Sequence, residues 1–226
     1  MEYHKLDIYI SIPRMDRFKI ASCGNQEKSK KLYQANLRIS QAFYPILNLT
    51  ETFLRNSIYN SIQHYFSDPD WIIIEKTGFM SDDSLGRSRF YLRENVIKAE
   101  IKISNKRSPV TSGRIIAEQS FGFWVSLLEP QHYRLTGGSA IQSFPNKPTT
   151  AGRVNIYNKL CSIRDFRNRI YHNEPICFQG NEINFTHTQD IKKQIFELLL
   201  WMDIDACKFV QEFDNIDNEI YRTFGF

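Results

Sequence analysis

A long run of apolar residues at helical spacing is the feature that most limits how this chain can fold. Between Lys28 and Phe66, apolar side chains return every three or four positions, which is the period of an α-helix. They are Leu32, Ala35, Ile39 and Phe43, followed by Ile46, Leu49, Phe53, Ile62 and Phe66. Because proline lacks a backbone N–H group and crowds the preceding turn, we expect a kink or break at Pro45 and a second helix from Ile46 to Phe66.

The remainder of the chain also predicts an all-α fold. Helical patterns recur in the stretches 89–106, 112–128, 149–171 and 186–213. We expect a single domain, residues 1–226, that folds as a bundle of about five or six helices, with enough core at 42% hydrophobic residues. Two segments predict extended structure instead: a short arm over residues 6–12, and a small β-hairpin near residues 176–186 around Gly180.

The cysteines and histidines are too dispersed to predict a metal site. The four cysteines contain no Cys-x-x-Cys pair and the five histidines no His-Glu-x-x-His pair, which are the spacings that bring zinc ligands together. We therefore expect no metal and no cofactor. The chain also lacks a run of about 18 apolar residues and the apolar core of a signal peptide, so we expect a cytoplasmic protein with no membrane partner.

The side chains best suited to catalysis lie together in the stretch 164–175, RDFRNRIYHNEP. They occupy the end of a predicted helix, which Pro175 terminates. Cleavage of RNA by attack of the 2′-hydroxyl requires a group that moves protons near neutral pH and a fixed positive charge beside the phosphate. His172 offers an imidazole, whose ordinary pKa is about 6.5, and Arg167 offers a guanidinium that binds phosphate oxygens in pairs.

The spacing of these groups leaves two interpretations open. Residues five apart on an ideal helix differ by about 140° and about 7.5 Å of rise, so Arg167 and His172 converge only if the last turn is loosened or if His172 reaches the phosphate from a different angle. Asn168 shares a face with both Arg164 and His172, and is therefore a candidate to donate to a phosphate or to orient the imidazole. The structural alternative is that His172 caps the helix C-terminus and the arginines are surface residues.

The net charge of +4 is distributed unevenly along the chain. Residues 76–114 contain nine Lys and Arg against four Asp and Glu, whereas residues 196–226 contain seven acidic residues against two basic ones. Three lysines recur every four residues and line one face of the predicted helix 89–106. Such a face could bind a phosphate backbone, or it could be an ordinary solvated face. The candidate RNA contacts are Lys98, Lys102, Lys106, Arg107 and Arg164.

Five short blocks of sequence add a family resemblance. They are residues 10–14 (ISIPR), 37–45 (LRISQAFYP), 53–56 (FLRN), 118–124 (EQSFGFW) and 167–175 (RNRIYHNEP). In this order they resemble the Abi family of bacterial abortive-infection proteins, which belong to the HEPN superfamily of helical ribonucleases. The chain departs from the family pattern at Asn173, where a second histidine is usual, and at Tyr171, where a smaller residue is commoner.

The resemblance implies a metal-independent endoribonuclease that leaves a 2′,3′-cyclic phosphate and acts as an effector or toxin of anti-phage defence. It implies that Arg167 and His172 are catalytic, with Asn168 as the polar residue that follows the arginine. It also implies a homodimer in which two Arg-x4-His pairs form one composite site, and a structured small RNA that restrains the protein. Further candidates for lining the site are Glu51, Arg55, Asn56 and Glu118.

A different function class stays open beside this one. A non-catalytic protein could dock a structured non-coding RNA through its lysine stripe without cleaving it. A third reading, transfer of nucleotides to protein side chains, would require a Gly-rich phosphate loop or a Gly-Ser motif with carboxylates, and the sequence contains neither.

Overall fold

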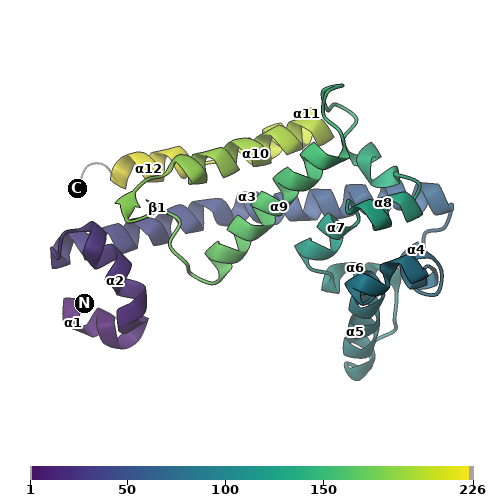
Figure 1. Cartoon of the computed structure of the whole chain (residues 1–226), viewed down its shortest axis with the longest axis horizontal. Helices are drawn as coiled ribbons and strands as arrows, with labels where there is room; N and C mark the ends of the chain where they lie inside the picture. The colour runs from purple at the N-terminus through teal and green to yellow at the C-terminus, as the bar shows by residue number, and fades with distance from the viewer. Residues whose placement is uncertain (1, 224–226) are drawn as a thin grey trace. The chain divides into compact units, whose positions relative to one another are not determined.

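The computed structural model describes residues 2–223, which are helical along most of their length (Figure 1). The predicted all-α class is therefore confirmed. The helices of this part of the chain are α1 (Tyr3–Leu6), α2 (Ile12–Ala21), α3 (Gln26–Phe66), α4 (Trp71–Ile74), α5 (Tyr91–Asn105), α6 (Ser112–Glu118), α7 (Phe121–Ser126), α8 (Pro130–Leu135), α9 (Arg153–Tyr171), α10 (Thr186–Met202), α11 (Ile204–Gln211) and α12 (Ile216–Thr223). Short 3₁₀ helices cover Phe79–Ser81, Asp83–Ser88 and Ser139–Ser143.

The predicted hairpin is confirmed as well. Strands β1 (Phe178–Gln179) and β2 (Glu182–Ile183) pair antiparallel, with Phe178 opposite Ile183. Gly180 lies in the tight turn between them with φ of +59°, a conformation that glycine adopts without steric cost.

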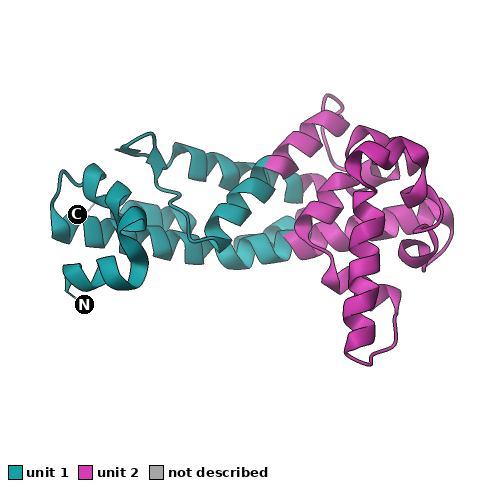
Figure 2. Ribbon diagram, turned by 60° about the horizontal axis from the view of Figure 1, so that its bottom comes forward, with its two compact units in different colours: residues 1–50, 162–199, 205–226 teal, residues 51–161, 200–204 magenta. Residues whose placement is uncertain are grey.

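The chain forms two compact units, each assembled from separate stretches of sequence (Figure 2). Unit 1 comprises residues 1–50, 162–199 and 205–226, and unit 2 comprises residues 51–161 and 200–204. The helices α3, α9, α10 and α11 contribute residues to both units. The expectation of a single domain stays a prediction.

Aromatic rings fill the core of unit 1. Phe43 of α3 packs edge-on against Phe166 of α9, with ring centroids 4.9 Å apart, and both side chains are almost fully buried. Phe18 of α2 lies 5.1 Å from Phe178 of β1 in a similar arrangement. Such edge-to-face contacts add to the stabilisation from burial, so the last turns of α9 have a defined position against α3.

Helix α3 continues without interruption through Pro45, so the predicted break is wrong. The proline costs a helix about 3 kcal/mol because residue 45 cannot donate to the carbonyl of Gln41. Phe43 and Ile46 on either side of it are completely buried, and each such burial contributes about 1.5–3 kcal/mol. Packing of the neighbours therefore outweighs the local cost.

The predicted extended arm over residues 6–12 is also wrong. After α1 the chain makes a π-helical turn, Asp7–Ser11, and enters α2 directly. Pro13 lies in the first turn of α2, where a missing N–H group costs nothing, so it starts a helix and does not end a strand. Ile8 and Tyr9 are 73% and 74% exposed, so the alternating apolar residues of this segment do not form one buried face.

The described residues contain twelve α-helices where we expected about five or six. Five of them, α1, α2, α4, α8 and α12, fall outside the stretches in which we expected helices, and two predicted helices are divided. The stretch 112–128 becomes α6 and α7, since Gln119 and Ser120 adopt extended dihedral angles. Serine is a favoured residue at the start of a helix, and Ser120 precedes α7 in that position. The stretch 186–213 becomes α10 and α11.

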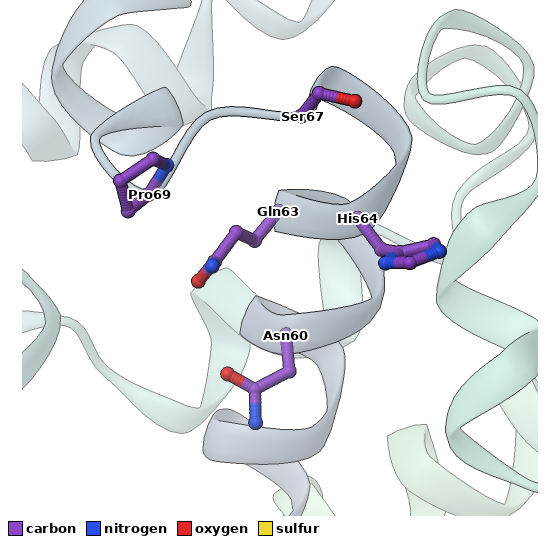
Figure 3. A pocket seen from close by; sticks show the side chains of 5 residues that line it. All are labelled: Asn60, Gln63, His64, Ser67 and Pro69. Carbon is purple, nitrogen blue, oxygen red and sulfur yellow. The ribbon is translucent and has the colours of Figure 1, made fainter.

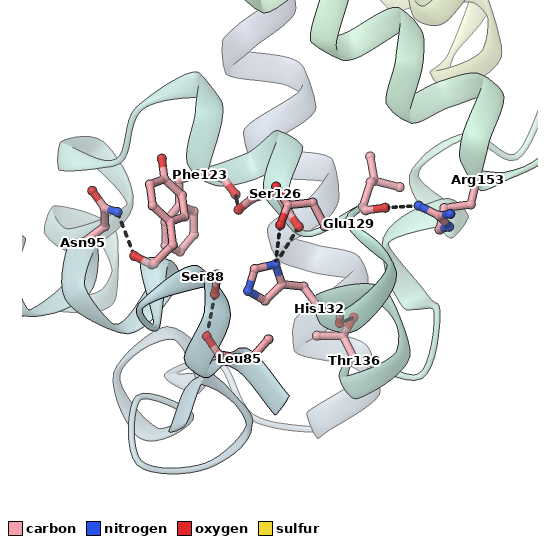
Figure 4. A network of polar contacts seen from close by, with 11 residues as sticks. Leu85, Ser88, Asn95, Phe123, Ser126, Glu129, His132, Thr136 and Arg153 are labelled. Carbon is pink, nitrogen blue, oxygen red and sulfur yellow. Dashed lines mark hydrogen bonds and ion pairs between the residues drawn. The ribbon is translucent and has the colours of Figure 1, made fainter. Parts of the chain in front are cut away.

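A buried histidine organises polar contacts inside unit 2 (Figure 4). His132 of α8 is 1% exposed, and its Nδ1 atom donates to the carbonyl oxygen of Ser126 at 2.9 Å. Oε2 of Glu129 lies 3.4 Å from the same nitrogen, and Oγ1 of Thr136 donates to the carbonyl of His132 at 3.0 Å. This histidine therefore joins α7 to α8 and is part of the core.

Candidate active site at the end of helix α9

Backbone groups close the C-terminus of α9, and they place His172 just beyond its last residue. The N–H of His172 makes a helical bond to the carbonyl of Asn168 at 2.9 Å. The N–H of Asn173 then bonds to the carbonyl of Ile170 at 3.0 Å, and that of Glu174 to the carbonyl of Arg169 at 2.8 Å. This pair of bonds is a Schellman motif, which satisfies the last carbonyls of a helix.

The left-handed conformation that this motif requires falls on Asn173, whose φ is +53°. Asparagine is one of the few residues other than glycine that tolerates this conformation.

The imidazole of His172 takes no part in closing the helix. Its side chain is exposed, and within residues 2–223 it makes no hydrogen bond or ion pair to another side chain. Because the backbone satisfies the helix end, the structural alternative of a side-chain cap is not what the structure contains.

The guanidinium of Arg167 lies over an aromatic ring one turn further along α9. Its central carbon is 4.1 Å from the centroid of the Tyr171 ring, which is close range for a cation–π contact. Nη1 of Arg167 also donates to Oδ1 of Asn168 at 3.4 Å. Half-buried and held in this way, the guanidinium is a positive charge in a defined position.

Three other arginines hold the segment that follows α9. Nη2 of Arg14 in α2 donates to the carbonyl of His172 at 3.3 Å, and Nη2 of Arg17 donates to the carbonyl of Gly180 at 2.7 Å. Arg169 donates to the carbonyl of Pro175 and lies 3.5 Å from a carboxylate oxygen of Glu174. Cations at the C-terminus of a helix are also favoured by its dipole.

A groove of about 290 Å³ lies beside this helix end, entirely within unit 1. One wall is a single face of α3, formed by Leu37, Ser40, Gln41 and Tyr44. The other wall consists of Ile170, Tyr171 and Asn173. The rings of Tyr44 and Tyr171 approach with centroids 5.9 Å apart and planes inclined by 36°.

The remaining candidate of unit 1, Arg164, is engaged with its neighbour. Its Nη2 atom lies 2.9 Å from Oδ1 of Asp165, and its Nε atom donates to the same oxygen at 3.0 Å. Arg164 therefore presents a partly neutralised charge to RNA.

The other candidates belong to unit 2 and are described within it. Lys98, Lys102, Lys106 and Arg107 are all exposed on α5 or at its C-terminal end. Glu118 accepts a hydrogen bond from Lys102 and lies 3.6 Å from Lys106, and the bond from Lys102 is the main reason that the pKa of Glu118 is below its usual range. Two of the three lysines are thus ion-paired.

The candidates on the unit 2 part of α3 show no clustering that points to catalysis. Nε of Arg55 donates to Oδ1 of the adjacent Asn56 at 3.3 Å, and Glu51 is half-buried. They stay candidates for lining the site.

A second cavity, of about 460 Å³, lies in unit 2 (Figure 3). Asn60, Gln63, His64, Ser67 and Pro69 line it. In Figure 3 the side chains of Gln63 and His64 point in different directions, so they do not converge on one ligand position. Within residues 2–223 no three His, Cys, Asp or Glu side chains are grouped so that they could hold a metal ion, and no helix has the length and apolar character to cross a membrane.

Comparison with known proteins identifies no relative: no family model matches the chain, and neither does any curated protein or solved structure at a significant level. The residues that the structure adds to the candidate site are Arg14, Gln41 and Tyr44. All three belong to the blocks of sequence described above, and position within those blocks is the signal that could have found them.

Proposed function

We propose that this chain is a metal-independent endoribonuclease of the HEPN type that acts in the cytoplasm as an effector or toxin of bacterial anti-phage defence. The observation that carries the proposal is the state of His172. Its imidazole is exposed at the end of α9 and is not used to close the helix, while Arg167 of the same helix is held in place on Tyr171.

The chemistry needs only groups that these residues supply. The 2′-oxygen of a ribose forms a bond to the adjacent phosphorus as the bond from phosphorus to the 5′-oxygen breaks, which leaves a 2′,3′-cyclic phosphate and a 5′-hydroxyl. His172 accepts the proton of the 2′-hydroxyl or delivers a proton to the leaving 5′-oxygen. The guanidinium of Arg167 stabilises the negative charge that develops on the phosphoryl oxygens.

A homodimer would complete this arrangement, because one imidazole cannot accept one proton and donate the other in the same step. In a composite site, His172 of a second copy of the chain is the other proton carrier. Asn168, which accepts a hydrogen bond from Arg167, helps to orient the guanidinium. A structured small RNA that occupies this site would restrain the activity.

The folding of the sequence blocks supports the same assignment. Arg14 of the first block donates to the backbone of His172 in the last block, and Tyr44 of the second block lies against Tyr171. Three blocks that are far apart in the sequence therefore meet around one helix end. This convergence is the arrangement expected of a site and not of unrelated surface residues.

The alternative is a non-catalytic protein that docks a structured RNA. The exposed basic side chains of α5, from Lys98 to Arg107, favour it. The two functions differ in the role of His172, which cleavage requires and docking does not.

A cleavage assay in EDTA on labelled single-stranded and structured RNAs tests the proposal. We expect wild type to produce 2′,3′-cyclic phosphate ends, and Arg167→Ala and His172→Ala to lose cleavage while retaining the far-UV circular dichroism of the wild type. His64→Ala, a substitution in unit 2, is the matched control and should cleave normally. Tight binding of RNA by wild type without cleavage in any condition would establish the docking function instead.

A further inference from the structure

The groove beside α9 has exposed aromatic side chains that the fold does not use as core. Tyr44 is 53% exposed and Tyr171 is 42% exposed, although their rings lie 5.9 Å apart. Leu37 extends the same surface at 38% exposure. Apolar side chains that remain exposed around a hollow are typical of a ligand site.

The composition of the groove selects the kind of ligand. Among residues 2–223, none that lines it is charged: its polar groups are the hydroxyls of Ser40, Tyr44 and Tyr171 and the amides of Gln41 and Asn173. A flat, uncharged group with hydrogen-bond donors and acceptors at its edge suits such a lining better than a phosphate or an ammonium ion.

The positive charges beside the groove indicate which kind of polymer carries this flat group. The guanidinium of Arg167 lies on the Tyr171 ring, and Arg14 is held at the adjacent carbonyl of His172. A chain that places a flat group in the groove would bring the phosphate attached to it toward positive charge. RNA has this alternation of neutral bases and anionic phosphates.

We propose that the groove lined by Tyr44 and Tyr171 binds one unstacked nucleobase of single-stranded RNA, next to the phosphate that Arg167 holds. This inference rests on the proposed function and specifies its substrate: the RNA must be single-stranded at this nucleotide, because a base inside a helix cannot enter the groove. Tyr44 is the stacking residue, and Gln41 and Asn173 contact the edge of the base.

The test measures binding separately from cleavage. Fluorescence anisotropy with a labelled single-stranded 2′-O-methyl oligoribonucleotide gives affinity alone, since the methyl group blocks the attacking hydroxyl. We expect Tyr44→Ala to weaken binding about 5- to 100-fold, the range found when one stacking side chain is removed. Tyr44→Phe keeps the ring and should stay within about twofold of wild type. Tyr221→Ala, which removes a tyrosine that is 80% exposed on α12, is the control and should bind as wild type does.

Pairing the oligomer with its complement should remove the difference between wild type and Tyr44→Ala, because the bases are then stacked in the duplex. The proposal is overturned if Tyr44→Ala binds the single strand as tightly as wild type does, if it loses affinity for duplex to the same extent, or if wild type binds no single strand. Tyr44-dependent binding together with no cleavage of the unmodified oligomer would leave the subsite intact and reject the nuclease. Cleavage without any dependence on Tyr44 would do the opposite.

Discussion

Arg14 donates a hydrogen bond to the backbone carbonyl of His172 at 3.3 Å, across 158 positions of sequence. The contact joins α2 to the residue that immediately follows α9. Because it is made to the main chain, it fixes the backbone of His172 and leaves the imidazole free of this bond. Arg14 is therefore a positioning residue in the proposed mechanism.

Replacing Arg14 by alanine should reduce RNA cleavage by about tenfold or more with little effect on stability. A small displacement of a catalytic group can cost a large factor in rate, whereas an exposed arginine contributes about 1 kcal/mol or less to folding. Lys19→Ala removes a cation from the same helix and should change neither quantity. Single-turnover rates and urea denaturation provide the measurements, and equal rates for Arg14→Ala and Lys19→Ala would remove Arg14 from the mechanism.

The elements that could be predicted from the sequence are those determined by local chemistry. Pro175 disfavours helical dihedral angles in the residue before it, and Gly180 favours a tight turn, so the end of α9 and the hairpin were predicted correctly. Pro45 also acts locally, but the burial of Phe43 and Ile46 overrides it. Their burial depends on contacts with segments distant in the sequence, so the local sequence around Pro45 could not predict it.

The parts of the site that could not be predicted depend on tertiary contacts. A helical period shows that Tyr44 lies on one face of α3, but not that Tyr171 covers that face. The same limit applies to the core of α3, where Leu54 and Ile58 are buried while Leu49 and Phe53 of the predicted stripe are half-buried. Period alone leaves the centre of a buried stripe uncertain by one residue to either side.

The left-handed conformation of Asn173 predicts opposite effects for one substitution at two nearby asparagines. Asn173→Ala should destabilise the protein by about 1 kcal/mol, because a β-carbon without a polar side chain disfavours φ of +53°. Asn168→Ala, in the last turns of α9, should be neutral or slightly stabilising, because alanine is the best helix former. Asn173→Gly should retain or raise stability. Urea denaturation followed by circular dichroism checks the order, and an Asn173→Ala variant as stable as Asn173→Gly would contradict it.

The buried thiol of Cys177 should lower the free energy of unfolding at alkaline pH. Burial raises the pKa of its thiol to about 12 from an ordinary value of about 9. Between these values the folded chain keeps a proton that the unfolded chain releases, so the contribution of Cys177 to the free energy of unfolding is complete below about pH 9 and declines as the pH rises towards 12.

Cys177→Ser should lessen this decline, although the substitution lowers stability at neutral pH. Mass spectrometry after brief alkylation provides a second measurement: Cys23, which is exposed, should react at pH 8 while Cys177 does not. Equal labelling of both cysteines in the folded protein would show that Cys177 is not shielded as described.

Glu118 offers a test of whether the lysine face of α5 binds RNA. It is paired with Lys102 and Lys106, and these bonds keep its pKa low, so it is ionised at neutral pH and offsets two of the lysines on α5. If α5 binds RNA, Glu118→Gln should raise affinity several-fold and steepen its dependence on salt, because more counterions are displaced when more positive charge meets phosphate. Glu100→Gln, which removes a carboxylate paired with Lys76 on the opposite face of α5, is the matched control. Anisotropy titrations at two or more salt concentrations give both quantities. An unchanged affinity and slope would mean that RNA does not touch the lysine face, which would leave the groove and the end of α9 as the place where RNA binds.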